Sequence, residues 1–491
     1  MHELIVPKEV KISEIKDNLS LSTNNYKKLS IKNQNRNKIV FYLKKDVPFE
    51  KGIEPGSGAY VEKSSQRFLR NSCINNIKFS EDEAKYIYLN PNYFYGCTLK
   101  NEDILMCTDA NIGDCCVYLA DGSNIAYSSG MVKLFFEDEK YKWYVFAFMR
   151  DDYFREQLNA KTPKGATIRH SGDNFLSCEI PSCDEIWVYS CFESIVKNIA
   201  YAENECRKKL IRSAELFDEE IIVKHYDYEN PTIAIISAQE RLDSSIYSDT
   251  VFQWKQNVKN YKNGYTNLNG FGFKTKRGPS LQKRDLGRSI QTDHYRKGYN
   301  ILIYPSDISD SGYVEKVTYL GARNRVWFLD EKYILFSSEG TIGKTFIICD
   351  DKMHFTTNIH GTMIYPIDMT TDIKKSIYLG LYLNYLRTNG VLNKLSVGAN
   401  GGSFAVGYWD NILIPKASDS FMDKLKDLYD QSADLNPVEF DKTKITKAGI
   451  YQLNNFIIQC KAILQNICDD LKNDELKDED YYINNLTFPP V

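Results

Sequence analysis

The chain has 491 residues, of which 43% are hydrophobic and 26% are charged, and its formal net charge is −3. This length allows two or three domains with substantial cores, and the composition is typical of a soluble globular protein. No apolar run reaches about 18 residues, so we expect no membrane-spanning helix, and the small net charge argues against a uniformly basic nucleic-acid-binding protein.

The first residues, MHELIVPKEVKISEIKDNLS, mix acidic and basic side chains and lack the pattern of a signal peptide, so we expect a cytoplasmic protein. The 12 cysteines form no Cys-x-x-Cys pair, which is the spacing that usually marks a zinc site. We therefore expect reduced, mostly buried thiols and neither a bound metal nor a cofactor.

The first half of the chain contains a segment that returns in the second half. Residues 102–118, EDILMCTDANIGDCCVY, align without a gap with residues 332–348, KYILFSSEGTIGKTFII, so that Gly113 meets Gly343. Segments of similar character follow in the same order in both halves: 130–136 and 361–367, 143–150 and 377–387, 162–172 and 396–407, and 174–181 and 411–416. The shared order predicts two copies of one domain.

The second copy contains SEGTIGKT at 338–345, which is one substitution away from the phosphate-binding pattern G-x-x-x-x-G-K-[ST]. A phosphate-binding loop stands between a strand and a helix, so that the helix N-terminus faces the phosphates. Here the residues after the turn, TFIICDD, are mostly β-branched or aromatic and end in turn residues, which indicates a strand. The first copy also has Asp114 in place of Lys344. The pattern therefore predicts a strand–turn–strand in each copy and no nucleotide site.

Other catalytic motifs are incomplete. Residues 89–93, LNPNY, resemble the [DNS]-P-P-[YF] motif of amino-methyltransferases but lack its second proline, and no glycine-rich S-adenosylmethionine loop follows an upstream strand. The six histidines form no His-x-x-x-His pair, and no paired acidic motif with a trailing lysine suggests a nuclease. We expect a protein without catalytic chemistry of its own.

A long helix is predicted between the two copies, from about Val188 to Glu220, because apolar residues recur at spacings of three and four. These residues are Ile195, Ile199, Ala202, Cys206, Leu210, Ala214 and Phe217. A shorter helix is predicted at 421–433, and after it a second stripe keeps heptad spacing. That stripe consists of Leu453, Ile457, Cys460, Leu464, Ile467 and Leu471. One stripe alone would indicate an ordinary core helix, whereas two, each following a copy of the same domain, predict helices that pack on one another.

This order of domain, helix, domain and helix resembles the specificity subunit of Type I restriction–modification systems. The segments RLDSSIY (241–247) and KGATIRHSGDNFLSCEIP (164–181) are similar to short stretches of that family, and each domain carries an Ile-Gly turn and ends in Ile-Pro. The Pro-x-x-x-Glu-Gln start of that family's long helices is absent after both Pro181 and Pro415.

The resemblance implies an α/β (α+β) fold with two duplicated target recognition domains, each with a twisted β-sheet, separated by long antiparallel coiled-coil helices. It implies a first recognition domain at 1–187, a central spacer helix at 188–222, a second recognition domain at 223–417, and a distal helical region at 418–478 that pairs with the central helix.

The resemblance also implies a function. Such a subunit is non-catalytic, reads a split double-stranded DNA target, and docks DNA adenine methyltransferase (modification) subunits, with a motor–nuclease (restriction) subunit as a further partner. Those partners would bring S-adenosylmethionine and ATP. The alternative is a stand-alone DNA-binding protein with duplicated recognition domains, such as a phage-defence-associated reader.

Positive charge is concentrated in the second domain. Eleven lysines and arginines lie between Trp254 and Asn300, opposed only by Asp285 and Asp293. Phosphate contacts position a protein on DNA, whereas arginine can read guanine and glutamine can read adenine. We therefore predict DNA contacts in a segment that could otherwise be a solvated charged loop. The predicted residues are Lys274, Lys276, Arg277, Ser280, Lys283, Arg284, Arg288 and Gln291.

The corresponding region of the first domain is expected at 63–72, KSSQRFLRNS. Its candidates for DNA contact are Gln66, Arg67, Arg70 and Asn71. The tips of the two repeated turns are polar, and they are explained equally well as DNA contacts or as structural turns. The remaining candidates are Asn111, Ser338, Thr341 and Lys344, in and beside these turns, and Lys164 and Arg169, in the segment 162–172.

Overall fold

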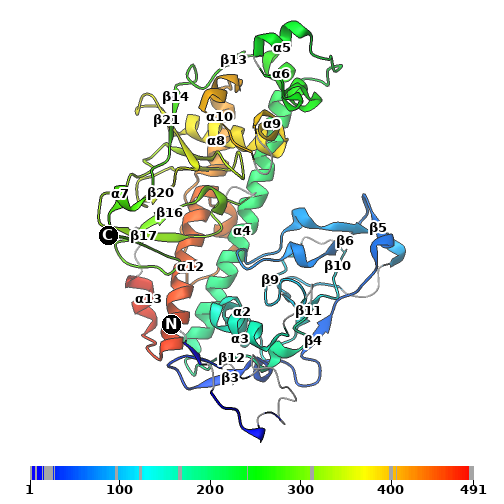
Figure 1. Cartoon of the computed structure of the whole chain (residues 1–491), viewed down its shortest axis with the longest axis vertical. Coiled ribbons are helices and arrows are strands. Elements are labelled where there is room, and N and C mark those ends of the chain that lie inside the picture. Colours follow the sequence, from blue (N-terminus) through cyan, green and yellow to red (C-terminus); the bar gives the residue numbers. More distant parts are fainter. Residues whose placement is uncertain are drawn as a thin grey trace. The chain divides into compact units, whose positions relative to one another are not determined.

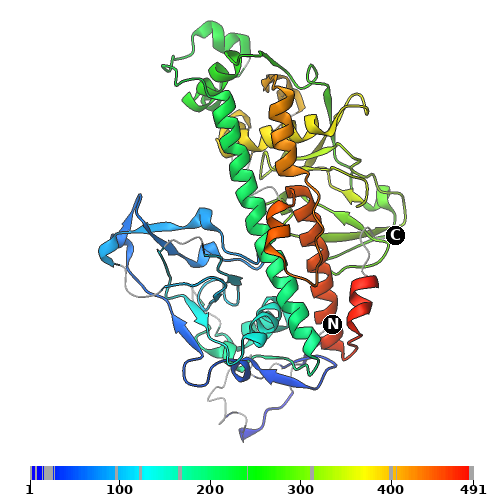
Figure 2. The same cartoon turned by 180° about the vertical axis from the view of Figure 1, so that it is seen from behind.

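The chain forms two compact units. The first comprises Met1–Asn204, Asn436–Lys442 and Gln459–Leu486, and the second comprises Glu205–Leu435, Thr443–Ile458 and Thr487–Val491. The computed structural model describes residues 3–5, 8–13, 15, 26, 28–93, 98–120, 124–163, 169–239, 241–309, 314–397, 402–404 and 406–485. Figures 1 and 2 show the elements of both units from opposite sides.

Within its described residues, the first unit holds two four-stranded sheets and two smaller sheets. The larger sheets have the strand orders β5-β7-β6-β10 and β4-β11-β8-β9, and the smaller ones pair β3 with β12 and β1 with β2. The strands are β1 (Glu3–Ile5), β2 (Lys28–Ser30), β3 (Arg36–Lys38), β4 (Phe49–Lys51), β5 (Tyr60–Val61), β6 (Gln66–Leu69), β7 (Ile87–Leu89), β8 (Ile104–Cys107), β9 (Cys115–Val117), β10 (Asn124–Tyr127), β11 (Met131–Leu134) and β12 (Glu179–Pro181).

The second unit has two four-stranded sheets and one smaller sheet in the part of it that the structure describes. The strand orders are β15-β17-β16-β20 and β14-β21-β18-β19, and the small sheet pairs β13 with β22. The strands are β13 (Tyr265–Thr266), β14 (Phe273–Arg277), β15 (Ser289–Thr292), β16 (Asn300–Leu302), β17 (Thr318–Ala322), β18 (Ile334–Ser337), β19 (Thr345–Ile347), β20 (Phe355–Thr356), β21 (Gly361–Pro366) and β22 (Ile414–Pro415).

The larger sheets of the two units have the same strand order and the same strand directions. Strand β10 lies parallel to β6, as β20 lies parallel to β16, and every other pair in these four sheets is antiparallel. The register also agrees, because Ile104 faces Val117 in the first unit and Ile334 faces Ile347 in the second. These are the pairs that the alignment of the two sequence copies places together.

Each of the two aligned segments forms a tight turn between two antiparallel strands, β8–β9 and β18–β19, as predicted. Gly113 and Gly343 have φ angles of 84° and 88°, a conformation that favours glycine. Their N–H groups donate to the carbonyl oxygens of Cys107 and Ser337, both at 2.9 Å. Because a strand follows each turn, neither turn has the strand–loop–helix arrangement of a phosphate-binding loop.

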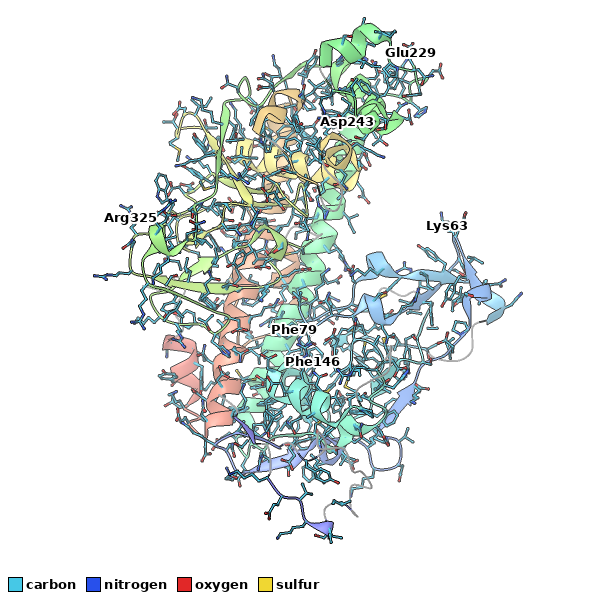
Figure 3. All side chains as sticks on the ribbon, in the orientation of Figure 1. Lys63, Phe79, Phe146, Glu229, Asp243 and Arg325 are labelled. Carbon is cyan, nitrogen blue, oxygen red and sulfur yellow. The ribbon has the colours of Figure 1, made fainter. Side chains whose placement is uncertain are left out.

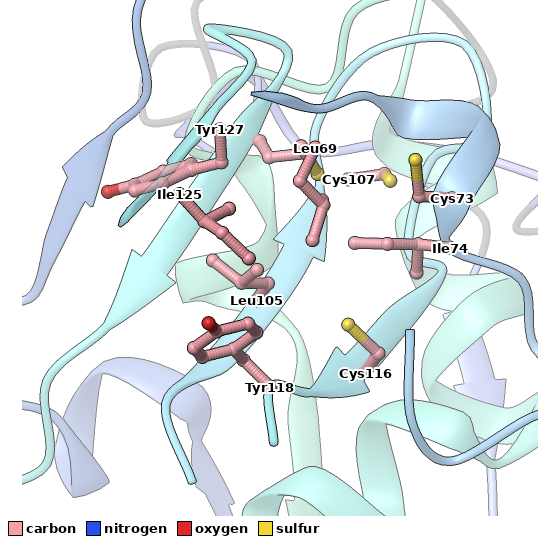
Figure 4. Close-up of a cluster of buried hydrophobic side chains, with 10 residues drawn as sticks. Leu69, Cys73, Ile74, Leu105, Cys107, Cys116, Tyr118, Ile125 and Tyr127 are labelled. Atoms are coloured by element: carbon pink, nitrogen blue, oxygen red, sulfur yellow. The ribbon is translucent and has the colours of Figure 1, made fainter. Parts of the chain in front are cut away.

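Apolar side chains from both larger sheets of the first unit form one buried cluster (Figure 4). Leu69 and Tyr127 come from one sheet, and Leu105 and Cys116 come from the other. Burying such side chains stabilises a fold by about 1.5–3 kcal/mol each, so the two sheets hold one another in place. The loops that leave these sheets therefore start from fixed points.

Helices accompany the sheets in both units. The first unit contains α2 (Glu139–Arg150), α3 (Asp152–Lys161) and α13 (Glu479–Asn485), and the second contains α5 (Ile233–Gln239), α6 (Asp249–Lys259), α7 (Lys283–Leu286), α8 (Ile373–Thr388), α9 (Val391–Leu395) and α10 (Asp419–Tyr429). Three further helices, α4 (Ile186–Ile221), α11 (Lys442–Lys447) and α12 (Ile450–Asn473), contribute residues to both units. In α2 and α8 the N-cap aspartates Asp138 and Asp372 accept a backbone N–H of the first turn, which satisfies a group that the helix leaves unpaired.

The two long helices begin and end close to the residues that the sequence predicts. The α12 stripe is buried, and so is the α4 stripe except at Ala214, which is partly exposed. Within the first unit, the buried Glu203 of α4 accepts from the backbone N–H of Phe79 at 2.7 Å and pairs with Lys461 of α12 at 3.1 Å. Within the second unit, the ring of Phe217 lies 5.5 Å from that of Phe421. Each unit is therefore built around its own part of these helices.

The α/β (α+β) class predicted from the sequence is confirmed at the level of mixed helices and several sheets. In the described parts of the chain, no helix combines the length and the apolar character needed to span a membrane.

Candidate nucleic-acid interface

Three segments of the second unit together form a basic surface. They are the end of strand β14, the residues 278–288 that contain α7, and the loop 323–327 that follows β17. The basic surface is defined by the exposed cations of these segments: Lys276, Arg277, Lys283, Arg284, Arg288, Arg323 and Arg325. Figure 3 labels Arg325, which lies in the loop 323–327 after β17.

Backbone hydrogen bonds hold the loop 323–327 against α7. The N–H of Arg323 donates to the carbonyl of Arg288 at 3.0 Å, and the N–H of Asn324 donates to that of Leu286 at 3.1 Å. Leu286 itself is buried in a cluster with Leu302, Leu320 and Val326. The cations of the basic surface therefore project from backbone that is anchored in the core.

Arg277 is held at the junction between β14 and the repeated turn of the second unit. Its Nε donates to the carbonyl of Ile359 at 2.8 Å, and its Nη2 pairs with Glu339 at 2.5 Å. Glu339 also contacts Nδ1 of His360. Two anchors fix the plane of the guanidinium, and a planar guanidinium is what bidentate recognition of guanine or phosphate requires.

The one acidic side chain on α7 is neutralised locally. Asp285 accepts hydrogen bonds from the side chains of Ser280 and Arg284, which lower the pKa of its carboxyl. Ser280 thus serves the structure of the loop as well as being a candidate for DNA contact.

Lys276 and Trp327 form a pair on the basic surface. The Lys276 ammonium lies 3.5 Å from the centre of the Trp327 ring, within cation–π range. Lys274 is exposed two residues earlier on the same strand. Gln291 is exposed on β15, where its Oε1 accepts from the hydroxyl of Tyr304 at 2.6 Å.

Two predicted residues of the repeated turn do not agree with a role on a DNA-facing surface. Ser338 and Lys344 are each only 8% exposed, and Ser338 Oγ lies 2.5 Å from Oγ1 of Thr362. Thr362 belongs to strand β21, so the sequence pattern around the turn could not reveal this contact of Ser338. Thr341 is partly exposed, with its hydroxyl 3.0 Å from that of Ser337.

In the first unit, the predicted residues of 63–72 have different surroundings. Arg70 is exposed, whereas Gln66 and Arg67 on β6 are partly exposed. Asn71 Nδ2 donates to the carbonyls of Asp109 at 2.7 Å and Gly130 at 3.3 Å, so its amide braces the repeated turn. Lys63, which Figure 3 labels, is exposed in the loop before β6.

The tip of the repeated turn in the first unit also carries a carboxylate–histidine pair. Asp109, which aligns with Glu339, lies 2.9 Å from Nδ1 of His170. Asn111 is exposed beside it, and Arg169 donates to the side chain of Asn159 at 2.9 Å. The predicted contact Lys164 lies outside the described residues.

The prediction that residues 63–72 correspond to the basic loop of the second unit is wrong by one strand. Strand β6 occupies the place of β16, and the true counterpart of 278–288 is 52–59, between β4 and β5. Gly52 and Gly278 start the two segments, and in each case an added Cβ would lie within about 2.3 Å of a backbone carbonyl oxygen of the neighbouring loop. The segments also end alike, since the carbonyl of Ala59 accepts from the N–H of Asn90 as that of Arg288 accepts from Arg323.

Sequence reasoning missed Arg323, Arg325 and Trp327. They lie outside the counted basic region, in a stretch, GARNRVW, that matches no motif. The available signal was a pair of arginines, Arg323 and Arg325, shortly before a tryptophan. Among the described residues, no group of three or more metal-binding side chains occurs.

The chain was compared with family models, with curated protein sequences and with solved structures. Neither a family model nor a curated protein sequence matches the chain. The structure is similar to the S subunit of the Type I restriction–modification system from M. genitalium, with 13% identity, coverage of 94% of this chain and 99% of that one, and a TM-score of 0.41. It is also similar to the HsdS subunit from Thermoanaerobacter tengcongensis, with 12% identity, coverage of 90% and 97%, and a TM-score of 0.27.

A third structure, from work on complex assembly and conformational transition of the type I R-M system, shares 12% identity over 90% of this chain and 98% of its own, with a TM-score of 0.27.

Proposed function

We propose that the chain is the DNA sequence-recognition subunit of a Type I restriction–modification complex and has no catalytic site of its own. The observation that carries the proposal is that two units of the same sheet topology present different segments at the same place. Residues 52–59 contain one acidic and no basic side chain, whereas 278–288 contain Lys283, Arg284 and Arg288 against Asp285. A constant scaffold with variable loops suits the reading of two different half-sites.

The two units are, in this proposal, copies of one recognition domain. The equivalent register of β8–β9 and β18–β19 supports this, as do the matching parallel pairs β6–β10 and β16–β20. If the two units had evolved independently, both would have had to arrive at the same strand order in both larger sheets. Both would also have had to add the last strand, β10 or β20, in parallel to β6 or β16.

The basic surface is the proposed DNA-reading face of the second unit. Arg277 has its guanidinium plane fixed, and Lys283, Arg284 and Arg288 lie on an anchored segment. Arginine pairs bidentately with guanine, and cations on fixed backbone place the protein on the phosphates. The first unit would read its half-site with a less basic face that includes Lys63, Arg70 and Asn111.

The long helices are the proposed spacer between the half-sites. We assign 1–187 and 223–417 to the recognition domains, 188–222 to the central helix, and 418–478 to the distal helical region that pairs with it as an antiparallel coiled coil. The proposed partners are double-stranded DNA, DNA adenine methyltransferase subunits and a motor–nuclease subunit, in the cytoplasm. The methyl donor and the nucleotide would be bound by those partners.

Binding-site selection on the full chain tests this function. The purified protein, alone and with the methyltransferase that co-purifies with it, is incubated with random-sequence duplexes, and the bound fraction is sequenced. The proposal expects two groups of selected base pairs separated by an unselected spacer. Selection of one continuous site would contradict it, and selection of a split site without any co-purifying methyltransferase would favour the stand-alone reader.

A further inference from the structure

Trp327 is an exposed indole in a protein that buries most of its tryptophans. Its relative exposure is 63%, whereas Trp143, Trp254 and Trp409 are at most 7% exposed and Trp187 is partly exposed. The hydrophobic effect opposes the exposure of a large aromatic side chain to water, so an exposed tryptophan calls for a functional explanation more than a buried one does.

The exposure of Trp327 does not come from a loose loop. Its carbonyl accepts a hydrogen bond from the hydroxyl of Thr356 at 2.7 Å, and two residues later the N–H of Leu329 donates to Phe355 at 2.9 Å. Val326 and Leu329 are buried on either side of it. The backbone is therefore fixed to strand β20 and turns the indole outward.

The surroundings of the indole are positively charged. Arg323 and Arg325 precede it, and Lys276 lies 3.5 Å from its ring centre. From Thr318 to Leu329 the chain contains no acidic residue. An exposed aromatic ring among cations is complementary to a polyanion with stacked bases, whereas a typical protein-binding hot spot is surrounded by less charged contacts.

From this arrangement we infer that Trp327 is a base-contacting wedge, which inserts against an opened base step while Lys276 and Arg325 hold the adjoining phosphates. The inference rests on the proposed DNA-binding function and deepens it. Intact duplexes hide the faces of their bases, so an apolar wedge acts by partly unstacking one step, and pyrimidine–purine steps open most easily. The wedge would thus add a preference for a deformable step to the half-site that the second unit reads.

The test uses the full chain, a mixed-sequence duplex at low salt and two readouts. Intrinsic fluorescence reports stacking on the indole, and permanganate oxidation reports unstacked thymines. We expect the duplex to quench the fluorescence of the wild type and to gain permanganate-reactive thymines. Trp327→Ala should lose both signals and bind about tenfold more weakly, while Trp187→Phe, the matched control, should keep them.

Two further variants sharpen the result. Lys276→Met should weaken binding and its salt dependence but keep the quenching, because the indole remains. Trp327→Phe should keep part of the permanganate signal, and its retention of the wild-type melting temperature separates a lost contact from a lost fold.

The failures are distinguishable. If the wild type binds duplex DNA without quenching, and Trp327→Ala binds equally well, the wedge is refuted while the DNA-recognition function stands. If Trp327→Ala impairs only co-purification with a methyltransferase, the residue contacts protein and the inference is also refuted. If the wild type does not bind duplex DNA at all, the proposed function itself fails.

Discussion

Neutralising the three cations of the α7 segment tests how the second unit uses its basic surface. The variant carries Lys283→Gln, Arg284→Gln and Arg288→Gln, all at exposed positions on a backbone that Leu286 anchors in the core. Glutamine keeps a polar side chain of similar length and helix propensity, so we expect the fold to persist. A control triple, Lys375→Gln, Lys424→Gln and Lys447→Gln, removes the same charge from exposed positions of the same unit outside the basic surface.

The expected size of the effect follows from counterion release. The logarithm of the affinity falls with the logarithm of the salt concentration, and each lost phosphate contact makes this slope less steep by about 0.9, so losing three contacts makes it less steep by about 2.7. The ratio of wild-type affinity to variant affinity should then be about 40-fold smaller at 200 mM salt than at 50 mM salt. If the same side chains contact base edges, the slope changes little and one half of the site loses about 1–3 kcal/mol of preference.

Fluorescence anisotropy with a labelled duplex measures the slope, and binding-site selection measures the preference. In both cases the control triple should behave as the wild type. The reasoning would be refuted by a variant whose slope and selected sequence both match those of the wild type, or by equal loss of preference in both halves of the site.

Three further predictions concern the helices and the cores. Inserting four residues in the 195–217 part of α4 lengthens the helix by about 6 Å, so the unread spacer should grow by one or two base pairs while both half-sites stay unchanged. Inserting two residues rotates the apolar stripe by about 200° and should disrupt helix pairing. Methylation mapping measures both variants, and altered half-sites at constant spacing would refute the spacer role. Glu203→Ala removes the buried carboxylate that pairs with Lys461 and accepts from the backbone N–H of Phe79. The free energy of unfolding, measured by thermal denaturation, should therefore fall by about 3–5 kcal/mol, and by less in Glu203→Gln. Equal stability of Glu203→Ala and the wild type would contradict the role given to this contact. Burial raises the pKa of the Cys115 thiol to about 12, so its thiolate is scarce at pH 8. Iodoacetamide labelling followed by peptide mapping should therefore modify the partly exposed Cys183 before Cys115, and equal labelling rates of the two in the native protein would contradict the burial of Cys115.

The sequence was most informative where a pattern is local and long. The apolar stripe predicted a helix from about Val188 to Glu220, and α4 runs from Ile186 to Ile221. The two repeated turns were predictable because β-branched residues flank a glycine that must adopt positive φ. These features depend on neighbours in the chain, so they can be read without the fold.

The sequence was least informative where short strands define the site. Strands β4 and β5 have three and two residues, too few for a periodic signal, so the counterpart of 278–288 was placed one strand too late. Ser338 is buried against Thr362 of β21, a strand that is distant in sequence. Trp327 becomes conspicuous only when its neighbours Val326 and Leu329 are found buried.

Methylome sequencing of the source strain, with and without this gene, is the most direct measurement of the central claim. The chain would direct an adenine methyltransferase to a split site, so the wild-type strain should carry methylated adenines in two short sequence elements separated by a fixed unread spacer. Deleting the gene should remove that whole pattern while the methyltransferase is still expressed. A methylation pattern that survives the deletion unchanged would contradict the claim.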